Sequence, residues 1–499
     1  MATNKTNEPV QLQLFDLSGR RALVVGLGQS GLAMARWAML RGAKVIVADT
    51  REQPALLPTL REELPEVGFI AGPLLESLLE ETEVVLWSPG LSTESGESAD
   101  FYAAALERSI PILGEIELFA QALAAMREQD YQPRVLAITG TNGKTTTARL
   151  LGHLCERAGL SVIVAGNIAP AALDALRIAI EQDALPQVWV LELSSFQLTV
   201  TESLAPDVAA ILNVTQDHFD WHASMQHYLD AKQRIYRGAA VCVFNRDDPA
   251  TRPRRDAKLA SFGTGAPAED GDFGIAHDGG LRWLAQAVPA EEPIGRRRKE
   301  PVAIMVKRLM PAEALRLRGT HNQLNVLAAL AMASAIGVPM ARMLHALRDF
   351  EGEAHRCQLV ASINEVEYYD DSKGTNVGAT VAALAGLGKR CVLIAGGEGK
   401  GQDFSPLMGT VRSHARAVLL IGRDAPMIQD AIAASGVPVE QCESLQAAVA
   451  RAAQLATARD AVLLSPACAS FDMFRNYGHR GEVFVEAVKD LALEAGIPC

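Results

Sequence analysis

Short apolar runs alternate with helical patterns along most of the chain. Each run is rich in β-branched and aliphatic residues. The runs occupy residues 21–26, 44–48, 84–87, 135–138, 161–165, 188–193, 208–214, 365–369, 391–395, 417–421 and 461–464. An apolar run followed by apolar residues at helical spacing is typical of a buried strand in a parallel sheet. The pattern therefore predicts an α/β protein in which strands alternate with helices.

A phosphate-binding loop is predicted in the middle of the chain. The run at 135–138 leads into a glycine-rich turn at 140–143, and a helical pattern begins at Lys144. Backbone N–H groups and the positive helix end would face the anion, Lys144 would add a charge, and Thr145 could hold Mg²⁺. The usual first glycine of this motif would fall at Ile138, so the loop is a variant. An ordinary strand-to-helix turn is the alternative, but Gly-Lys-Thr at the junction favours a nucleotide site.

A second glycine motif follows the first strand. Gly26, Gly28 and Gly31 have the GxGxxG spacing, and Asp49 ends the next strand. This arrangement fits a dinucleotide-binding unit, and Gly90 lies after the third strand, where open α/β sheets bind ligands. Tight packing of helix on strand without a ligand is the alternative. A nucleotide or sugar nucleotide is favoured, and NAD is not required.

Metal-ligand residue types stand at the ends of two central strands. Glu192 lies near the end of the run at 188–193. The run at 208–214 opens onto two acids and two histidines, namely Asp217, His218, Asp220 and His222. These groups could bind a metal or transfer protons. A structural ion pair for Glu192 and a solvated loop for the others are the alternatives, which the neighbouring phosphate loop disfavours.

Lys232 lies on the apolar face of the next predicted helix. It shares that face with Tyr228, Leu229, Ile235 and Tyr236. In one interpretation the amine reaches water along its aliphatic stem. In the other, Lys232 is a partly desolvated, neutral amine that is able to react. The residues alone favour the first interpretation.

Polar residues near further element ends suggest where ligands bind in the last third of the chain. Asn322 and Asn325 open a long Ala/Leu/Met-rich helix and could reach a base or ribose, although simple N-cap residues are the alternative. Lys373, Lys400 and Ser470 follow the strands of a third parallel sheet. Their positions predict a pocket for a small anionic substrate.

Composition and length complete this picture. With 499 residues, the chain is long enough for about three domains. We expect a Rossmann-like N-terminal domain at 1–114, a phosphate-loop central domain at 115–352 and a Rossmann-like C-terminal domain at 353–499, each on a mainly parallel sheet. Residues 263–301 break the pattern, and we predict hairpins or a mobile loop there, with the basic run 296–299 at a solvated edge.

Charge and cysteine usage exclude some classes of protein. The net charge of −12 argues against a general nucleic-acid binder. Seven cysteines without CxxC pairs suit a reducing cytosol and give no zinc signature. The first 18 residues lack the apolar core of a signal peptide, and no run is suited to span a membrane. We therefore expect a cytoplasmic protein that binds neither nucleic acid nor membrane. We also expect a monomer, which these properties do not themselves establish.

Together these motifs resemble the Mur ligase family over nearly the whole chain. The resemblance is carried by GTNGKTT at 140–146, LELSSFQ at 191–197, NVTQDH at 213–218, HNQLN at 321–325, His355-Arg356, DSKGTN at 371–376, GGEGK at 396–400 and SPACAS at 465–470. The first four of these motifs are found broadly in the family. The motifs DSKGTN and SPACAS are similar to those of the branch of the family that uses D-glutamate.

The resemblance implies an ATP-dependent amide-bond ligase in cytoplasmic peptidoglycan precursor synthesis, and so in cell-wall biogenesis, cell shape and cell division. A carboxylate of UDP-N-acetylmuramoyl-L-alanine would take the γ-phosphate of ATP, and the amine of D-glutamate would then displace phosphate from the acyl phosphate. The family also implies two Mg²⁺ ions and a CO2-derived carbamate on Lys232. That carbamate reverses the preference drawn above from the residues alone.

The family's functional residues map onto this sequence as follows. The implied catalytic residues are Lys144, His218, Lys232 and Arg356. The implied metal ligands are Thr145, Glu192, His218 and Lys232 as its carbamate. The implied ATP-binding residues are Gly140, Thr141, Asn142, Gly143, Lys144, Thr145, Thr146, Asn322, Asn325, Arg356, Asp371 and Lys373. The implied UDP-sugar-binding residues are Gly28, Gln29, Ser30, Gly31, Asp49, Thr50, Arg51, Gly90, Asn167 and Gln197. The implied D-glutamate-binding residues are Thr375, Lys400, Ser470, Phe471 and Tyr477. Tyr477 departs from the phenylalanine usual in the family.

Three other functions remain open at this stage. Another amide ligase of the same family would add a different amino acid or extend folate with glutamate. An NAD-dependent oxidoreductase would use the GxGxxG motif but would leave the phosphate loop and the third domain without a role. A phosphate-loop ATPase acting on nucleic acid or protein partners is disfavoured by the acidic charge.

Overall fold

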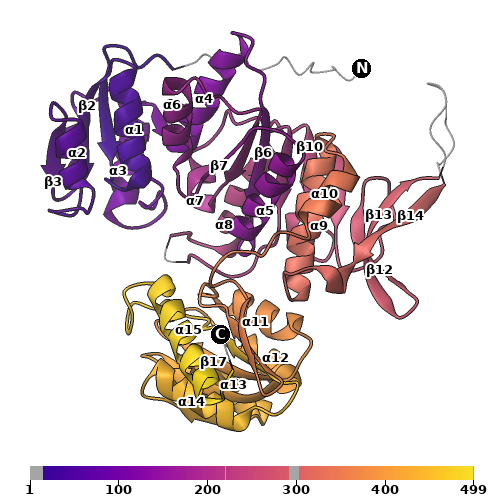
Figure 1. Cartoon of the computed structure of the whole chain (residues 1–499). Helices are drawn as coiled ribbons and strands as arrows, with labels where there is room; N and C mark the ends of the chain where they lie inside the picture. Colours follow the sequence, from indigo (N-terminus) through magenta and orange to yellow (C-terminus); the bar gives the residue numbers. More distant parts are fainter. Residues whose placement is uncertain (1–14, 220, 291–302, 498–499) are drawn as a thin grey trace, which may run out of the picture. The chain divides into compact units, whose positions relative to one another are not determined.

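The computed structural model describes residues 15–219, 221–290 and 303–497. The chain divides into two compact units. One comprises Met1–Ala137, Ser161–Ala209 and Trp221–Ala240, and the other comprises Ile138–Leu160, Ala210–Asp220 and Val241–Cys499. The strands of the described residues form three sheets, of five, nine and six strands (Figure 1). Most strand pairs are parallel and helices connect them, which confirms the predicted α/β class.

The first sheet has the strand order β3-β2-β1-β4-β5, and every pair in it is parallel. Its elements are β1 (Arg21–Val25), α1 (Gln29–Leu40), β2 (Lys44–Asp49), α2 (Leu57–Glu63), β3 (Gly68–Ala71), β4 (Val84–Trp87), α3 (Gly96–Glu107) and β5 (Ile112–Gly114). The strand order reverses between β1 and β4, where Ser88 Oγ donates to Gly26 O at 2.6 Å. Ligands of open α/β sheets bind at such a reversal, beyond the carboxyl ends of the strands.

The second sheet has the order β14-β13-β12-β11-β10-β9-β6-β8-β7. Its strands are β6 (Arg134–Thr139), β7 (Val162–Gly166), β8 (Val188–Glu192), β9 (Val208–Ile211), β10 (Val241–Asn245), β11 (Lys258–Phe262), β12 (Phe273–Asp278), β13 (Leu281–Pro289) and β14 (Ile304–Pro311). The helices of this part are α4 (Glu115–Arg127), α5 (Lys144–Arg157), α6 (Ala172–Glu181), α7 (Ser195–Thr199), α8 (Met225–Gln233), α9 (Thr320–Ala335) and α10 (Met340–Ala346). Strands β8 and β9 are buried at every residue, as their unbroken apolar runs predict.

The irregular region after β11 is an antiparallel extension of this sheet. Strand β12 pairs with β13, and β13 pairs with β14, both in antiparallel register. The pair β12–β13 confirms a hairpin inside residues 263–301, whereas β14 begins at Ile304, beyond that range. The basic run at 296–299 lies outside the described residues.

The third sheet has the order β15-β16-β20-β17-β18-β19 and is parallel except for the edge pair β15 and β16. Its elements are β15 (Gln358–Ile363), β16 (Val366–Asp370), α11 (Val377–Gly386), β17 (Cys391–Gly396), α12 (Leu407–His414), β18 (Ala415–Ile421), α13 (Ala425–Ile432), β19 (Val439–Gln441), α14 (Leu445–Leu455), β20 (Ala461–Leu464) and α15 (Tyr477–Glu494).

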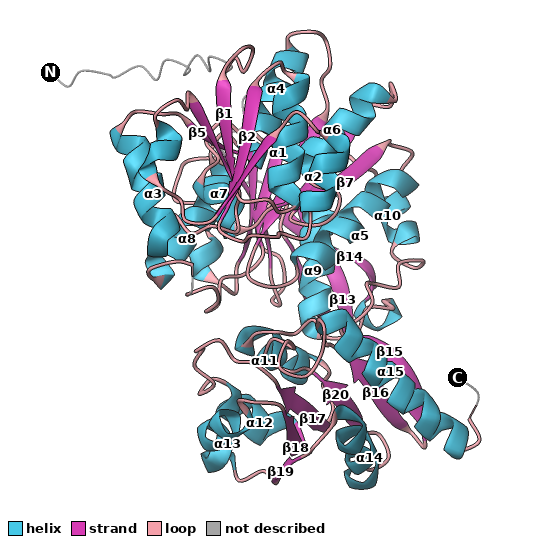
Figure 2. Cartoon of the chain, turned by 90° about the vertical axis from the view of Figure 1, so that its left-hand side faces the viewer, coloured by secondary structure: helices cyan, strands magenta, loops and turns pink. Residues whose placement is uncertain are grey.

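Helices cover both faces of the third sheet. Along β17, Leu393 packs into a core with residues of α11, α12 and α13, whereas Val392 and Ile394 pack with residues of α14 and α15. Figure 2 shows the sheet between these two groups of helices. A strand buried on both faces needs an apolar run without alternation, which is why the sequence pattern located it correctly. Over the described part of the chain, no helix combines the length and the apolar character needed to cross a bilayer.

Candidate functional site

The phosphate loop connects β6 to α5. Gly143, the residue before the helix, has φ 82°, a left-handed conformation that favours glycine. A Cβ atom at Gly143 would lie 2.3 Å from Asn325 Oδ1, so the loop and the start of α9 are in close contact. Lys144 Nζ donates to Gly140 O and Thr141 O, each at 2.9 Å. The loop thus presents the N-terminus of α5 and a lysine to an anion.

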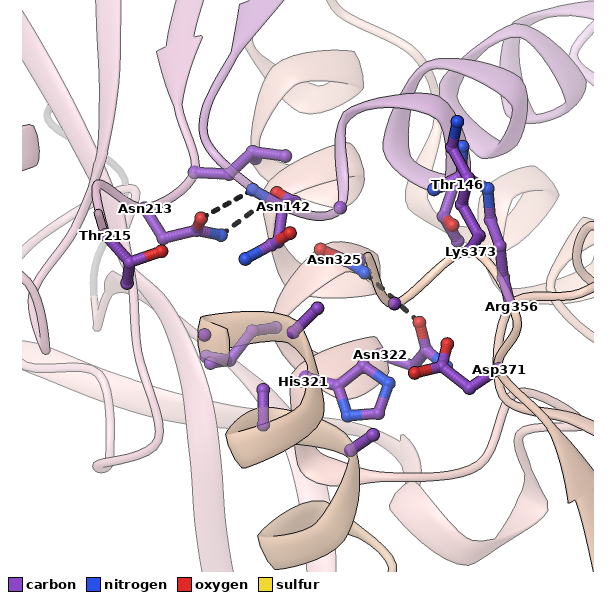
Figure 3. Close-up of a pocket in the computed structure, with 18 of the residues that line it drawn as sticks. Asn142, Thr146, Asn213, Thr215, His321, Asn322, Asn325, Arg356, Asp371 and Lys373 are labelled. Atoms are coloured by element: carbon purple, nitrogen blue, oxygen red, sulfur yellow. Dashed lines mark hydrogen bonds between the residues drawn. The ribbon is translucent and has the colours of Figure 1, made fainter. Parts of the chain in front are cut away.

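The segment that follows β9 fixes the shape of the phosphate loop. Asn142 N donates to Asn213 Oδ1 at 2.8 Å, and Asn213 Nδ2 donates back to Asn142 O at 3.0 Å (Figure 3). Thr141 Oγ1 donates to Thr215 O at 3.1 Å and accepts from Thr215 N at 2.9 Å. Sequence reasoning missed Asn213 and Thr215 as site residues. Both residues belong to the NVTQDH motif at 213–218, and this motif is the sequence signal that could have found them.

A cavity lies beside this loop (Figure 3). Its walls come from the phosphate loop, the segment after β9, the ends of β10 and β11, the start of α9, the loop before β15, the loop after β16, and α11. The predicted ATP-binding residues in its lining are Asn142, Gly143, Thr146, Asn322, Asn325, Arg356, Asp371 and Lys373. The other four predicted ATP-binding residues, Gly140, Thr141, Lys144 and Thr145, belong to the loop and the helix start but do not line this cavity. Amides, a carboxylate and two cations around one cavity suit a nucleotide.

The start of α9 supplies buried amides. Asn322 Nδ2 donates to Arg318 O at 2.8 Å, and Asn325 Nδ2 donates to Asn322 Oδ1 at 3.1 Å. The N-cap residue is Gly319, and no side chain caps the helix, so the alternative reading of the two asparagines as N-caps is wrong. His321 also lines the cavity, and burial lowers the pKa of its imidazole to about 4. His321 is therefore neutral at physiological pH.

Asp371 is the buried carboxyl of the cavity. Its Oδ1 accepts from Cys357 N at 3.1 Å, and its Oδ2 accepts from Ser465 Oγ at 2.7 Å. Burial raises the pKa of Asp371 to about 7, although the Ser465 hydrogen bond acts in the opposite direction. Lys373, two residues on, has its Nζ 3.9 Å from the centroid of the Tyr477 ring.

A histidine-aspartate pair supports the segment that carries Arg356. His355 Nδ1 lies 2.6 Å from Asp370 Oδ2, and that hydrogen bond raises the pKa of His355. His355 has φ 63° and is followed by Arg356, which lines the cavity. A Cβ atom at Gly481 would lie 2.1 Å from His355 Nδ1, so a glycine of α15 leaves room for the histidine ring.

The predicted D-glutamate residues lie outside the cavity of Figure 3. Ser470 is buried, Thr375 is half-buried and Lys400 is exposed with φ 51°. Phe471 and Tyr477 are exposed by 65% and 38%, so both rings are accessible to a ligand. Their role in amino-acid binding stays a prediction.

The carboxylate of Asp49 accepts hydrogen bonds that hold the glycine motif of the first sheet in place. Leu27 N and Arg51 N donate to its two oxygens at 2.7 and 2.9 Å, and Arg51 Nε donates at 2.8 Å. Burial alone would raise the pKa of Asp49, but the hydrogen bonds from Arg51 and Leu27 outweigh burial and lower it. A Cβ atom at Gly31 would lie 2.0 Å from Gly26 O, so this glycine allows close packing of helix on strand.

Some of the other predicted sugar-nucleotide residues are exposed, and others form hydrogen bonds within the protein. Gln29, Thr50 and Gly90 are exposed, and Gly28 has open space on its Cβ side. Ser30 Oγ donates to the buried Glu115 at 2.7 Å. Gln197 closes the capping box of α7, where its Oε1 accepts from Ser194 N at 3.0 Å.

Glu192 ends β8 as a buried carboxylate. Its Oε1 accepts from Asn167 Nδ2 at 3.0 Å. Its Oε2 is buried and has no hydrogen-bond partner among the described residues. An orphaned carboxylate oxygen at the end of a buried strand has the chemistry of a cation ligand.

Lys232 is only 1% exposed. Its Nζ lies 4.4 Å from the centroid of the Tyr228 ring. The interpretation in which its amine reaches water is therefore wrong. The predicted helical face holds for Tyr228 and Lys232, whereas Ile235 and Tyr236 lie in a short 3₁₀ turn, Arg234–Tyr236, directly after α8.

The loop after β9 holds the other predicted metal-site residues. His218 has φ 60°, and its Nε2 lies 3.6 Å from Asp217 Oδ2. Asp217 Oδ2 also accepts from Asn376 Nδ2 at 3.1 Å. His222 is buried, and its Nε2 lies 2.9 Å from Ser195 Oγ. Asp220 lies outside the described residues.

Comparison with known proteins defines the class to which this fold and site belong. Three family models match the chain: "Mur ligase MurD-like, N-terminal domain" at 20–114, "Mur ligase middle domain" at 138–333 and "Mur ligase, glutamate ligase domain" at 355–468. The chain belongs to the Mur ligase family, and it is an enzyme of the ligase class. The resemblance inferred from its motifs is confirmed.

Curated relatives narrow the class further. The chain is 56% identical to the UDP-N-acetylmuramoylalanine--D-glutamate ligase of Ralstonia nicotianae, over 97% of this chain and 99% of that protein. It is 55% identical to the ligase of the same name from Cupriavidus pinatubonensis, again over 97% and 99% of the two chains.

Solved structures share the fold at low sequence identity. MurF of Acinetobacter baumannii has a TM-score of 0.56 at 16% identity and covers 95% of this chain and 91% of its own. MurF ligase of Thermotoga maritima, solved in complex with ADP, has a TM-score of 0.55 at 16% identity over 97% of both chains. These likenesses confirm the fold class.

Proposed function

We propose that this enzyme joins D-glutamate to UDP-N-acetylmuramoyl-L-alanine with ATP, in the cytoplasmic synthesis of a peptidoglycan precursor. The observation that carries the proposal is the cavity that joins the phosphate loop to the DSKGTN segment at 371–376, in a chain with full-length D-glutamate ligase relatives. We also propose that the enzyme acts as a monomer. The proposed domain limits are 1–114, 115–352 and 353–499.

ATP would lie along the cavity with its phosphates at the N-terminus of α5. Lys144 and Arg356 would neutralise charge on the transferring phosphoryl group, whose transfer depends on positioning and electrostatics rather than on a covalent nucleophile. Asn322 and Asn325 would contact the adenine side, and Asp371 the ribose. The γ-phosphate would pass to the substrate carboxylate, and the D-glutamate amine would displace it as inorganic phosphate.

Mg²⁺ and a carbamate fit the residues present. The orphaned Oε2 of Glu192 fits a cation, and burial of Lys232 favours the neutral amine that combines with CO2. Thr145, Glu192, His218 and carbamylated Lys232 would hold the metal, for which we propose two ions. Bound Mg²⁺ would supply charge neutralisation for the phosphates.

The sugar nucleotide would bind to residues of the first sheet and of the segments after β7 and β8, and D-glutamate to loops and α15 of the C-terminal part. The proposed sugar-nucleotide contacts are Gly28, Gln29, Ser30, Gly31, Asp49, Thr50, Arg51, Gly90, Asn167 and Gln197. The proposed D-glutamate contacts are Thr375, Lys400, Ser470, Phe471 and Tyr477. Asp49 would act through the shape of the glycine loop, since both of its oxygens accept hydrogen bonds from the protein.

The test is release of phosphate from ATP and Mg²⁺ with UDP-N-acetylmuramoyl-L-alanine as acceptor. Separate reactions receive D-glutamate, L-glutamate, meso-diaminopimelate or L-lysine, and Lys144→Met serves as the inactive control. Release that needs both the sugar nucleotide and D-glutamate supports the proposal. Equal release with another amino acid, or release without the sugar nucleotide, would overturn it.

A further inference from the structure

Arg480 is a fully buried arginine in the first turn of α15. Its side chain is 0% exposed. Nε donates to Ser372 Oγ at 3.0 Å, and Nη2 donates to Ser372 O at 2.8 Å and to Cys468 O at 3.1 Å. Nη1 donates to Ala469 O at 3.3 Å. These bonds use four of the five N–H groups that a guanidinium carries.

The partners of this guanidinium are neutral. Within the described part of the chain Arg480 forms no ion pair with a carboxylate, and three of its four acceptors are backbone carbonyls. Burial lowers the pKa of Arg480 to about 10. The carboxylates of Asp370, Asp371 and Asp472 act on Arg480 only from beyond ion-pair distance. A buried cation without a direct ion pair is unfavourable for stability, and an apolar side chain would fill the same space at less cost. The arrangement therefore suggests a role beyond packing.

The four bonds join two loops that the sequence keeps almost a hundred residues apart. Ser372 lies between Asp371 and Lys373, which both line the nucleotide cavity. Ala469 directly precedes Ser470, a predicted D-glutamate residue. Arg480 thus sets the position of the 371–375 loop relative to the 465–470 loop.

Further bonds make this connection rigid. Ser372 Oγ donates to Tyr477 O at 2.7 Å, so the same hydroxyl links α15 to the loop a second time. Ala467 N donates to Gly374 O at 2.9 Å and links the two loops directly. The planar guanidinium fixes both distance and angle between its acceptors, which a lysine ammonium does not.

We propose that Arg480 is a positioning residue for the amino-acid substrate: by bridging Ser372 to Cys468 and Ala469 it holds Thr375 and Ser470 at the spacing that D-glutamate requires. The inference rests on the proposed function. The nucleotide has further contacts in the phosphate loop and α9, whereas the proposed D-glutamate contacts lie only on the loops and α15 of the C-terminal part. Loss of the bridge therefore affects D-glutamate more than ATP.

The experiment compares Arg480→Lys with the full-length wild type. Phosphate release gives KM for D-glutamate, and titration of a fluorescent ATP analogue without D-glutamate gives nucleotide affinity. We expect KM for D-glutamate to rise at least about tenfold, equivalent to the loss of one charge-assisted hydrogen bond, while nucleotide affinity stays within about threefold. Arg451→Lys is the matched control, because Arg451 makes a forked, half-exposed pair with Glu440 at 2.7 and 2.9 Å in the same sheet domain.

Ser372→Ala tests the same bridge if Arg480→Lys fails to fold. It keeps the arginine and removes only the hydroxyl that accepts from Nε, and we expect a rise in KM for D-glutamate of about threefold or more. An unchanged KM for D-glutamate in either folded variant, or an equal loss of nucleotide affinity, overturns the positioning role. A wild-type enzyme without D-glutamate-dependent phosphate release would instead overturn the proposed function itself.

Discussion

Substitution of Asp371 by asparagine should stabilise the protein, and more so at high pH. Asp371 is 9% exposed, and burial raises its pKa from the ordinary 3.8 to about 7. Between these two pH values the carboxyl is protonated in the folded chain and ionised in the unfolded chain. Folding therefore takes up a proton, and the stability of the wild type falls as the pH rises towards 7. Asparagine is neutral in both states and escapes this loss.

The magnitude follows from the pKa. Between pH 5 and the folded pKa of about 7, each pH unit lowers the free energy of unfolding of the wild type by about 1.36 kcal/mol. Between pH 5 and pH 8 the wild type should therefore lose about 3 kcal/mol of stability relative to Asp371→Asn. In domains of 150–250 residues such a difference moves the thermal midpoint by roughly 5–10 °C.

The hydrogen bonds of the site allow asparagine to replace aspartate. The amide oxygen can accept from Cys357 N, as Asp371 Oδ1 does at 3.1 Å. The amide nitrogen can donate to Ser465 Oγ, whose own proton then points to Thr380 Oγ1 at 3.1 Å. The substitution therefore leaves no buried group unpaired.

The assay is calorimetry of wild type and Asp371→Asn without ligands at pH 5, 6, 7 and 8 and constant ionic strength. The midpoint of the variant should exceed that of the wild type by a margin that widens with pH. Asp430→Asn is the control, since Asp430 is an exposed acid of α13, and its margin should stay constant. A margin for Asp371→Asn that is constant or largest at pH 5 would refute the reasoning. Activity should fall despite the added stability, because the carboxylate is a proposed ribose ligand.

Three further predictions concern the rest of the site. Glu192→Gln keeps the hydrogen bond from Asn167 but removes the negative charge. The rate of phosphate release should fall at least about a hundredfold, and a higher Mg²⁺ concentration should be needed for the half-maximal rate. An unchanged Mg²⁺ titration would contradict a metal-binding role. Lys232→Ala should be inactive and partly restored by acetate, and ¹³CO2 should give a carbamate NMR signal in the wild type only; activity of the alanine variant without acetate would exclude the carbamate. Gly481→Ala should lower the free energy of unfolding by about 1–3 kcal/mol, and with it the thermal midpoint, because the added Cβ would lie 2.1 Å from His355 Nδ1. An unchanged midpoint would show that the histidine ring moves aside freely.

Most strands that are covered on both faces could be predicted from sequence, although the fully buried strand Val241–Asn245 was missed. Val188–Glu192 and Cys391–Gly396 read as unbroken apolar runs, since no residue in them meets water. The edge strands Gly68–Ala71 and Gln358–Ile363 were missed. Both are largely exposed, and their mixed composition carries no apolar signal.

Burial that comes from distant segments could not be predicted. Helix α7 packs against α8, the helix that carries Lys232, and Lys232 is buried. A helical face shows which residues point the same way but not what covers them. The burial of Lys232 contradicts the interpretation that the residues alone favoured, and the carbamate implied by the family resemblance stays a prediction.

The site shows the same limit. The glycine turn and Lys144 could be read from spacing because local backbone geometry demands those residues. The reciprocal bonds between Asn142 and Asn213, and the bridge from Arg480 to Ser372, join residues 71 and 108 positions apart. Only the folded chain brings such partners together.

The close contact between Gly143 and Asn325 has a consequence for how the enzyme matures. The nucleotide cavity is completed by segments from residue 142 to residue 383, so a growing chain has made the phosphate loop long before it has made the walls around it. High-affinity nucleotide binding is then a late event in folding, and it draws together parts that the sequence separates. Nucleotide present during synthesis would stabilise the chain in the last step of folding, and it would protect fully folded chains selectively from proteolysis.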